Sequence, residues 1–184
     1  MSVEERILEA AAERLAAVGA EGLTISSVAE TSGVSRPTVY AHFGTREQLM
    51  SAALQRTADR VLTRVTEQAR GAATAADYVV EVVLAARTEF RHQPALAPVA
   101  FPQRGTILFD GDVLGPRALA MTRSFLAPLL EFDPRLAPQL DEIAETSIRF
   151  LLSLILFDSD NSRSDSRLRE YLHRRLVPAL GLDR

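Results

Sequence analysis

Residues 23–49 read LTISSVAETSGVSRPTVYAHFGTREQL, and this stretch decides how the amino-terminal part of the chain folds. Ala29, Gly33 and Val39 stand at relative positions 1, 5 and 11 of two short helical patterns. A small alanine lets two helices approach closely, a glycine takes the positive φ of a tight turn, and a valine fills the space between the helices. The stretch therefore predicts a helix-turn-helix unit.

Capping residues set the bounds of these helices. Thr24 predicts the amino-terminal cap of the first short helix, and Ser35 that of the second, which Gly44 then ends. Thr45 and Gln48 have the spacing of a capping box and open a long helix that runs to about residue 71. A further helix, with an apolar stripe over residues 3–18, precedes the unit.

The rest of the chain also follows a helical period, and alternating patterns of strand length are scarce. A helix is expected over residues 75–92, whereas residues 94–138 hold seven of the nine prolines and should form only short or interrupted helices. Beyond them, a helix through residue 157 has two apolar stripes and therefore needs two burial surfaces. A last helix follows the polar loop 158–166. The fold class is all-α.

Composition limits the function. The chain has 184 residues, no cysteine and no lysine, and its 21 arginines face 24 acidic residues, for a net charge of -3. The acidic total exerts no general attraction on a polyanion, so that a nucleic-acid role must depend on a local surface. No signal peptide or membrane span is recognised, and a cytoplasmic protein with no membrane partner is expected.

Catalytic and metal-binding signals are missing. The three histidines, His42, His92 and His173, have no second ligand at metal-binding spacing, and the polar run from Asp158 lacks the glycine and glutamate of a calcium loop. No nucleophile elbow, phosphate loop or dinucleotide motif occurs. We therefore expect no catalytic residue, no metal and no cofactor, and a protein that is not an enzyme.

The stretch 23–49 resembles the amino-terminal DNA-binding region of the TetR family of one-component transcriptional regulators, and the resemblance covers about residues 5–54. It implies a three-helix DNA-binding domain, residues 1–45, and a helical ligand-binding and dimerisation domain, residues 46–184. Thr24 matches a position that caps its helix and touches a phosphate. Tyr40 and His42 match phosphate-binding positions of the recognition helix, and Arg46 replaces the usual lysine while keeping the cation.

Sequence reading is expected from the variable positions of the second helix. Arg36 leads because its guanidinium can pair with guanine O6 and N7, and Pro37 and Thr38 can meet a thymine methyl group. Serines 26 and 27 add a base or phosphate contact. The DNA-binding set is Thr24, Ser26, Ser27, Ser35, Arg36, Pro37, Thr38, Tyr40, His42, Thr45 and Arg46.

One feature departs from the family. Many members carry a basic arm ahead of the first helix, whereas this chain begins MSVEER, and residues 1–50 hold four arginines against seven glutamates. The affinity of one subunit for DNA should therefore be modest, and it should decrease only slowly with rising salt concentration. Binding then calls for a homodimer on a palindromic operator, with recognition helices roughly 34–36 Å apart.

Two further residue sets are predicted for the carboxy-terminal domain. The effector cavity is assigned to Tyr78, Val83, Phe90, Phe101, Phe109, Met121 and Phe125, for which core packing is the alternative use. Arg87, Arg91 and Arg104 are candidate polar partners there, with a solvated helix face as the commoner explanation. The dimer contact is assigned to Ile143, Ser147, Phe150, Leu154, Leu168, Leu172 and Leu176.

The function expected from these patterns is a repressor of transcription that binds double-stranded operator DNA as a homodimer and is released by a small apolar effector. Two alternatives stay open. In the first, the protein binds DNA as an activator or as an effector-independent regulator. In the second, it is a helical module that binds a ligand or another protein and has weak DNA affinity.

Overall fold

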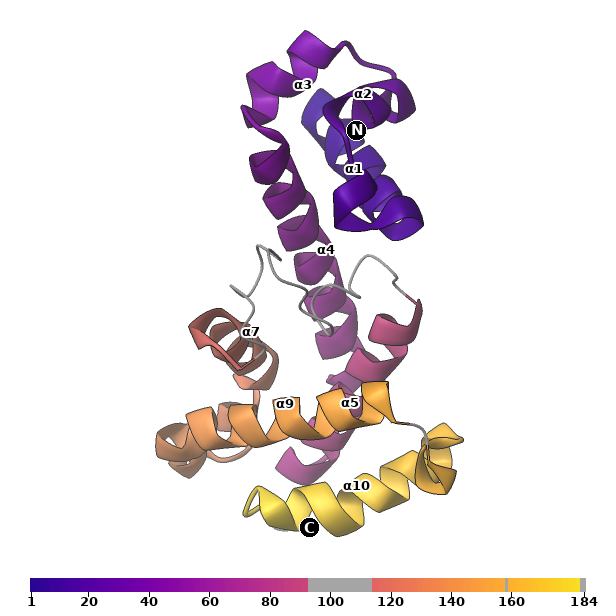
Figure 1. The fold of residues 1–184 in the computed structure, drawn as a ribbon. Coiled ribbons are helices and arrows are strands. Elements are labelled where there is room, and N and C mark those ends of the chain that lie inside the picture. Colours follow the sequence, from indigo (N-terminus) through magenta and orange to yellow (C-terminus); the bar gives the residue numbers. More distant parts are fainter. Residues whose placement is uncertain (93–113, 158, 183–184) are drawn as a thin grey trace. The chain divides into compact units, whose positions relative to one another are not determined.

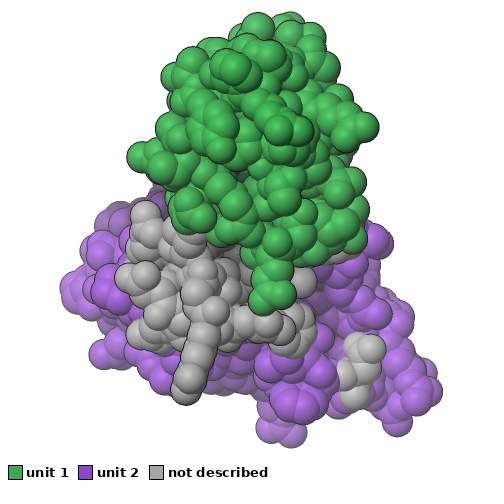
Figure 2. Space-filling view, turned by 45° about the horizontal axis from the view of Figure 1, so that its top comes forward, with its two compact units in different colours: residues 1–60, 93–113 green, residues 61–92, 114–184 purple. Residues whose placement is uncertain are grey.

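The computed structural model describes residues 1–92, 114–157 and 159–182, and in these residues all regular secondary structure is helical (Figure 1). The predicted all-α fold is confirmed. The described residues divide into two compact units, residues 1–60 and residues 61–92 with 114–182 (Figure 2). The division falls within the long helix α4.

The first unit contains the predicted helix-turn-helix. Its helices are α1 (Val3–Gly22), α2 (Ile25–Ser32), α3 (Arg36–Phe43) and the first part of α4 (Arg46–Ala69). The predicted caps are all present. Thr24 accepts a hydrogen bond from the Ser27 amide at 3.1 Å, and Thr45 and Gln48 form a reciprocal capping box at 3.0 and 3.1 Å.

The turn between α2 and α3 has the geometry that its three marker residues predict. Gly33 lies in the left-handed region, with φ 67° and ψ 33°, and its amide donates to the Ala29 and Glu30 carbonyls at the end of α2. Val39 is fully buried and Ala29 is 4% exposed. The side of α3 that carries Val39 therefore packs into the unit, and its remaining faces stay open to solvent.

Helix α5 (Ala75–His92) lies at the centre of the second unit. Almost every side chain from Ala76 to Arg87 is buried, as expected for a helix covered on all sides. Helices α7, α8, α9 and α10 all pack against α5. The other elements of this unit are α7 (Pro116–Leu126), α8 (Leu129–Phe132), η2 (Pro134–Gln139), α9 (Leu140–Leu156), η3 (Asp160–Ser162) and α10 (Asp165–Ala179).

The proline-rich segment is interrupted where the structure describes it. From Leu114 onward it forms the short helices α7 and α8 and the 3₁₀ turn η2, as predicted, while residues 93–113 lie outside the described residues. The helix that the sequence predicts through residue 157 begins at Leu140. Pro138 has no amide hydrogen to continue an α-helical ladder, and Leu136 belongs to the preceding 3₁₀ turn.

Candidate nucleic-acid interface

The recognition helix α3 exposes the side chains that the sequence assigns to DNA. Ser35 caps it by accepting from the Thr38 amide at 3.3 Å, and its hydroxyl lies 2.8 Å from that of Thr38. The next two residues, Arg36 and Pro37, occupy the first turn, and both are exposed. Since the helix start presents free backbone amides, this end of α3 has both positive potential and donors for a nucleic acid.

The outer face of α3 continues with two polar aromatic side chains. Tyr40 is 53% exposed, and His42 is exposed beside Phe43, with ring centroids 6.2 Å apart. More than half of the Tyr40 side chain is thus open to solvent. Tyr40 and His42 lie on the solvent side of a helix that Val39 anchors, so that both can approach a DNA backbone.

The amino-terminal end of α2 uses most of its hydroxyl groups internally. The Thr24 amide donates to the Ser27 hydroxyl at 3.2 Å, and that hydroxyl donates to the Thr24 carbonyl at 3.0 Å. Ser26 is exposed and makes none of these contacts. Of the two serines predicted to contact DNA, Ser26 is therefore the one with a free side chain in this structure.

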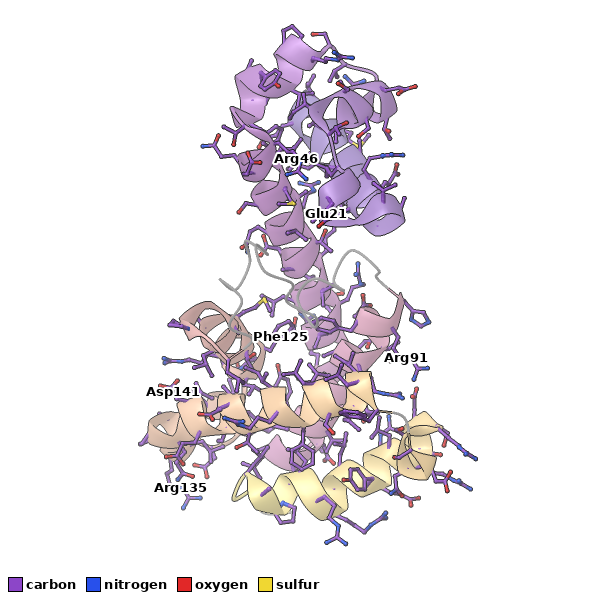
Figure 3. The ribbon with its side chains drawn as sticks, viewed as in Figure 1. Glu21, Arg46, Arg91, Phe125, Arg135 and Asp141 are labelled. Atoms are coloured by element: carbon purple, nitrogen blue, oxygen red, sulfur yellow. The ribbon has the colours of Figure 1, made fainter. Side chains whose placement is uncertain are left out.

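Arg46 behaves differently from the expectation that its cation meets a DNA phosphate. Arg46 stands in the first turn of α4 (Figure 3). Its Nε donates to the Leu23 carbonyl at 2.6 Å, and its Nη2 donates to the Ala20 carbonyl. Its Nη1 lies 3.4 Å from Oε1 of Glu47. Each guanidinium nitrogen has a partner inside the first unit, because the end of α1 presents carbonyls with no helical donor.

Other arginines of α4 also turn toward α1. Arg60 lies 2.5 Å from Glu9 and Arg56 lies 3.8 Å from Glu5. The hydrogen bond from Arg60 holds the pKa of the Glu9 carboxyl below its usual range. These pairs were not expected from the sequence, since the partners are far apart in the chain. They leave Arg36 as the arginine placed on the exposed face of α3.

Residues 7–53 match the family model described as bacterial regulatory proteins, tetR family. Residues 7–53 therefore carry a TetR-family DNA-binding domain. The matched residues cover the greater part of α1, all of α2 and α3, and the first turns of α4. No curated protein sequence matches the chain.

Solved structures of TetR-family proteins share the fold over nearly the whole chain. A TetR-family transcriptional regulator from Streptomyces coelicolor is 24% identical with a TM-score of 0.68, and the match covers 98% of both chains. The TetR family repressor AlkX from Dietzia sp. is 19% identical (TM-score 0.64, 96% of both chains). AibR, solved with isovaleryl coenzyme A and operator DNA, is 16% identical (TM-score 0.61, 94% of this chain and 96% of AibR).

The residues predicted to line an effector cavity have mixed positions in this TetR-family fold. Tyr78, Val83 and Phe125 are buried, and the Tyr78 hydroxyl donates to the Phe125 carbonyl at 2.8 Å. Burial raises the pKa of Tyr78 to about 12, with the Glu131 carboxylate adding to the effect. Phe90 and Met121 are half-buried. Phe101 and Phe109 lie outside the described residues, as does Arg104.

Arg87 is buried, which corrects the expectation of a solvated helix face. The residue is 5% exposed, and its guanidinium donates to the Leu154 carbonyl at 3.3 Å and to the Ser162 carbonyl at 2.9 Å. It joins α5 to the end of α9 and to η3. The signal available in the sequence was its position one turn after Val83 in a helix that is apolar nearly all round.

The residues predicted for the dimer contact are mostly interior. Leu168, Leu172 and Leu176 are fully buried, and Ile143, Ser147 and Leu154 are at most 8% exposed. These six side chains pack within one protomer and offer no surface to a second one, which corrects the expectation for them. Only Phe150 is half-buried. The apolar stripe that the sequence shows marks the core of the unit.

Apolar surface does occur in the last turns of α9 and at the residue that follows it. Phe157 is 69% exposed and Leu156 is 45% exposed, next to the half-buried side chains of Leu151, Leu152 and Ile155.

None of the described helices combines the length and the apolar character that crossing a bilayer requires. No group of three histidine, aspartate or glutamate side chains within residues 1–92, 114–157 and 159–182 is arranged to hold a metal ion.

Proposed function

We propose that this TetR-family protein is a ligand-responsive regulator of transcription, a repressor that acts in the cytoplasm by binding a palindromic operator. The observation that carries the proposal is the exposed face of α3. There Arg36, Tyr40 and His42 project from a helix whose opposite side Val39 anchors in the core. The guanidinium can read a guanine, and the two aromatic side chains can donate to phosphates that fix the register.

The proposal includes a homodimer, because one reading face with a single arginine has little affinity for DNA by itself. Two α3 helices related by a two-fold axis meet successive major grooves when they stand roughly 34–36 Å apart. We assign the contact to the exposed and half-buried apolar surface at the end of α9 instead of the buried stripe. Its residues are Phe150, Leu151, Leu152, Ile155, Leu156 and Phe157.

The effector is proposed to bind in the second unit. AibR, which shares the fold, was solved with both isovaleryl coenzyme A and operator DNA, and this supports a small apolar or acyl ligand for the present protein. Helix α4 contains the division between the units, and a change in its direction is the proposed route to the recognition helices. The effector needs only to prefer the conformation whose spacing fits DNA poorly.

Selection of bound duplexes from a randomised DNA pool, at two salt concentrations, tests the DNA-binding step. An enriched palindrome is the expected result. Enrichment of a single half-site would contradict the dimer, and sedimentation of the Phe157→Asp variant beside the parent examines the proposed contact directly. A thermal-shift screen with isovaleryl coenzyme A, followed by a reporter assay, separates a repressor from an activator or an effector-independent regulator.

The second candidate function, a helical binding module with weak DNA affinity, has one specific observation in its favour. Three arginines of α4 point toward α1, as described above, and the first 50 residues have more acids than bases. Absence of any enriched duplex at the lower salt concentration would support this candidate over the regulator.

A further inference from the structure

The contacts of Arg46 bring together the first turn of α4 and the corner between α1 and α2. Leu23 is the residue that follows α1 and precedes the cap of α2, and Ala20 lies in the last turn of α1. Both carbonyls accept from the same guanidinium, one at Nε and one at Nη2. The side chain is one-third exposed, so that protein covers most of it.

The end of α1 lacks a cation of its own. Its last turn contains no basic residue, and Gly19, with φ 70° and ψ -177°, interrupts the helical backbone just before Ala20. A positive group there would meet carbonyls that lack helical donors. Arg46 supplies that group from a residue more than 20 positions later in the chain. A guanidinium suits the position, because it is a planar fork that can reach two carbonyls at once.

Lysine, which the TetR resemblance places at this position, lacks that geometry. Its ammonium group is a point charge on a flexible stem with no rigid fork, so it holds two carbonyls in a less fixed geometry than the Nε and Nη2 contacts of Arg46 to Leu23 and Ala20. The replacement of lysine by Arg46 therefore changes which role the position fulfils, even though the charge is the same.

Two more arginines, in the middle of α4, contact the amino-terminal half of α1. Arg56 and Arg60 face Glu5 and Glu9 of α1, at 3.8 and 2.5 Å. Together with Arg46 they link α1 to α4 at three points. The cap of α2 begins directly at Leu23, so that the position of α2, and through the Gly33 turn that of α3, depends on the corner that Arg46 holds.

We propose that Arg46 is a positioning residue: it fixes the α1–α2 corner against α4, thereby orients the DNA-reading helices, and neutralises no DNA phosphate. The inference rests on the proposed DNA-binding function, but its structural half can be measured without DNA. Lysine and glutamine substitutions distinguish the two roles, because lysine keeps the charge and loses the fork, and glutamine loses both.

The experiment compares the parent with Arg46→Lys and Arg46→Gln. Thermal unfolding is measured without DNA. Affinity is then measured at a temperature at which all three proteins are folded, for the duplex that the parent selects and for a scrambled duplex of equal length. Tyr40→Phe, which alters a proposed phosphate contact on the exposed face of α3, is the matched control.

Positioning predicts that both Arg46 variants unfold at a lower temperature. It also predicts that the ratio of selected to scrambled affinity falls in both variants and stays that of the parent in Tyr40→Phe. The slope of log K against log salt stays that of the parent. A smaller fraction of folded protein would lower the apparent affinity for both duplexes equally and leave this ratio unchanged. The ratio therefore separates the orientation of the DNA-reading helices from the stability of the protein.

Three results would overturn the proposal. The first is an Arg46→Lys variant that matches the parent in unfolding and affinity, and the second is an Arg46→Gln variant whose salt slope is lower by about one, since either is the mark of a phosphate contact. An unchanged affinity ratio in the two variants would reduce Arg46 to a stabilising residue. If the parent itself selects no duplex, the proposed DNA-binding function fails. An unfolding temperature of Arg46→Lys equal to that of the parent would, by itself, refute the structural role of Arg46.

Discussion

Gly44, which joins α3 to α4, is expected to tolerate substitution less well than any turn position that merely needs a positive φ. Its backbone has φ 68° and ψ -64°, whereas Gly33 has φ 67° and ψ 33° in the ordinary left-handed region. A Cβ added at Gly44 would lie 2.5 Å from Oε1 of Gln48, the atom that accepts from the Thr45 amide. A Cβ at Gly33 would meet no atom within 4 Å.

These differences set how far each substitution lowers the free energy of unfolding. Gly33→Ala costs about 1–2 kcal/mol for the left-handed conformation, and loss of freedom in the unfolded chain offsets about 0.4–1 kcal/mol, for a net of about 1 kcal/mol. Gly44→Ala adds strain of about 1–3 kcal/mol in a sparsely populated backbone region and displaces the Gln48 side chain, which costs a cap of about 1 kcal/mol. We expect a total of about 3 kcal/mol.

Urea unfolding followed by circular dichroism at 222 nm measures these values for Gly33→Ala, Gly44→Ala, Gln48→Ala and the Gly44→Ala/Gln48→Ala double variant. The double variant should lose about 1 kcal/mol less than the sum of its single variants, because the cap can be lost only once. The reasoning would be refuted if Gly44→Ala destabilised no more than Gly33→Ala. Strict additivity in the double variant would refute the steric part.

Three further predictions concern single side chains. Arg36→Ala should relax the base preference in a duplex selection, whereas Tyr40→Phe should weaken binding to all duplexes about equally, and equal profiles for the two variants would contradict the contact assignment. Arg87→Met should lower the free energy of unfolding by about 3 kcal/mol, because two buried carbonyls lose a charged donor, while Arg175→Met on the exposed side of α10 should change it little. The pKa of Tyr78 is raised to about 12 in the folded protein from about 10 in the unfolded chain, so its contribution to stability is complete below pH 10 and declines from there toward pH 12. Unfolding midpoints between pH 9 and 11 should fall more steeply for the parent than for Tyr78→Phe, and parallel curves would contradict this.

The helix-turn-helix was predictable because its determinants are local. Thr24, Ser35 and Thr45 each accept from the amide three residues ahead, and Gly33 sets its own backbone angles. Such signals depend on spacing within one turn of helix and can be read from a single sequence. The same holds for the exposed face of α3, which follows once Val39 is known to point inward.

What the sequence could not supply are contacts between distant segments. Arg46 meets carbonyls 23 and 26 residues before it, and backbone carbonyls leave no mark in a pattern of side chains. The apolar stripes of α9 and α10 predicted burial correctly but not what covers them, and most of the stripe assigned to a partner subunit packs inside the protomer. Periodicity reports that a face is covered, and three-dimensional packing decides by what.

The use of arginine in the first unit limits how strongly DNA binding can depend on salt. Arg46, Arg56 and Arg60 are engaged with α1, whereas Arg36 lies free on α3, so that a dimer neutralises about two to four phosphates. The slope of log K against log salt is about -0.9 per phosphate, which gives about -2 to -4. Affinity for the selected duplex should then fall by about 10- to 150-fold between 50 and 200 mM salt. A slope steeper than about -6 would mean that these arginines leave α1 when DNA binds, and the attachment of α1 to α4 would then be a state of the free protein only.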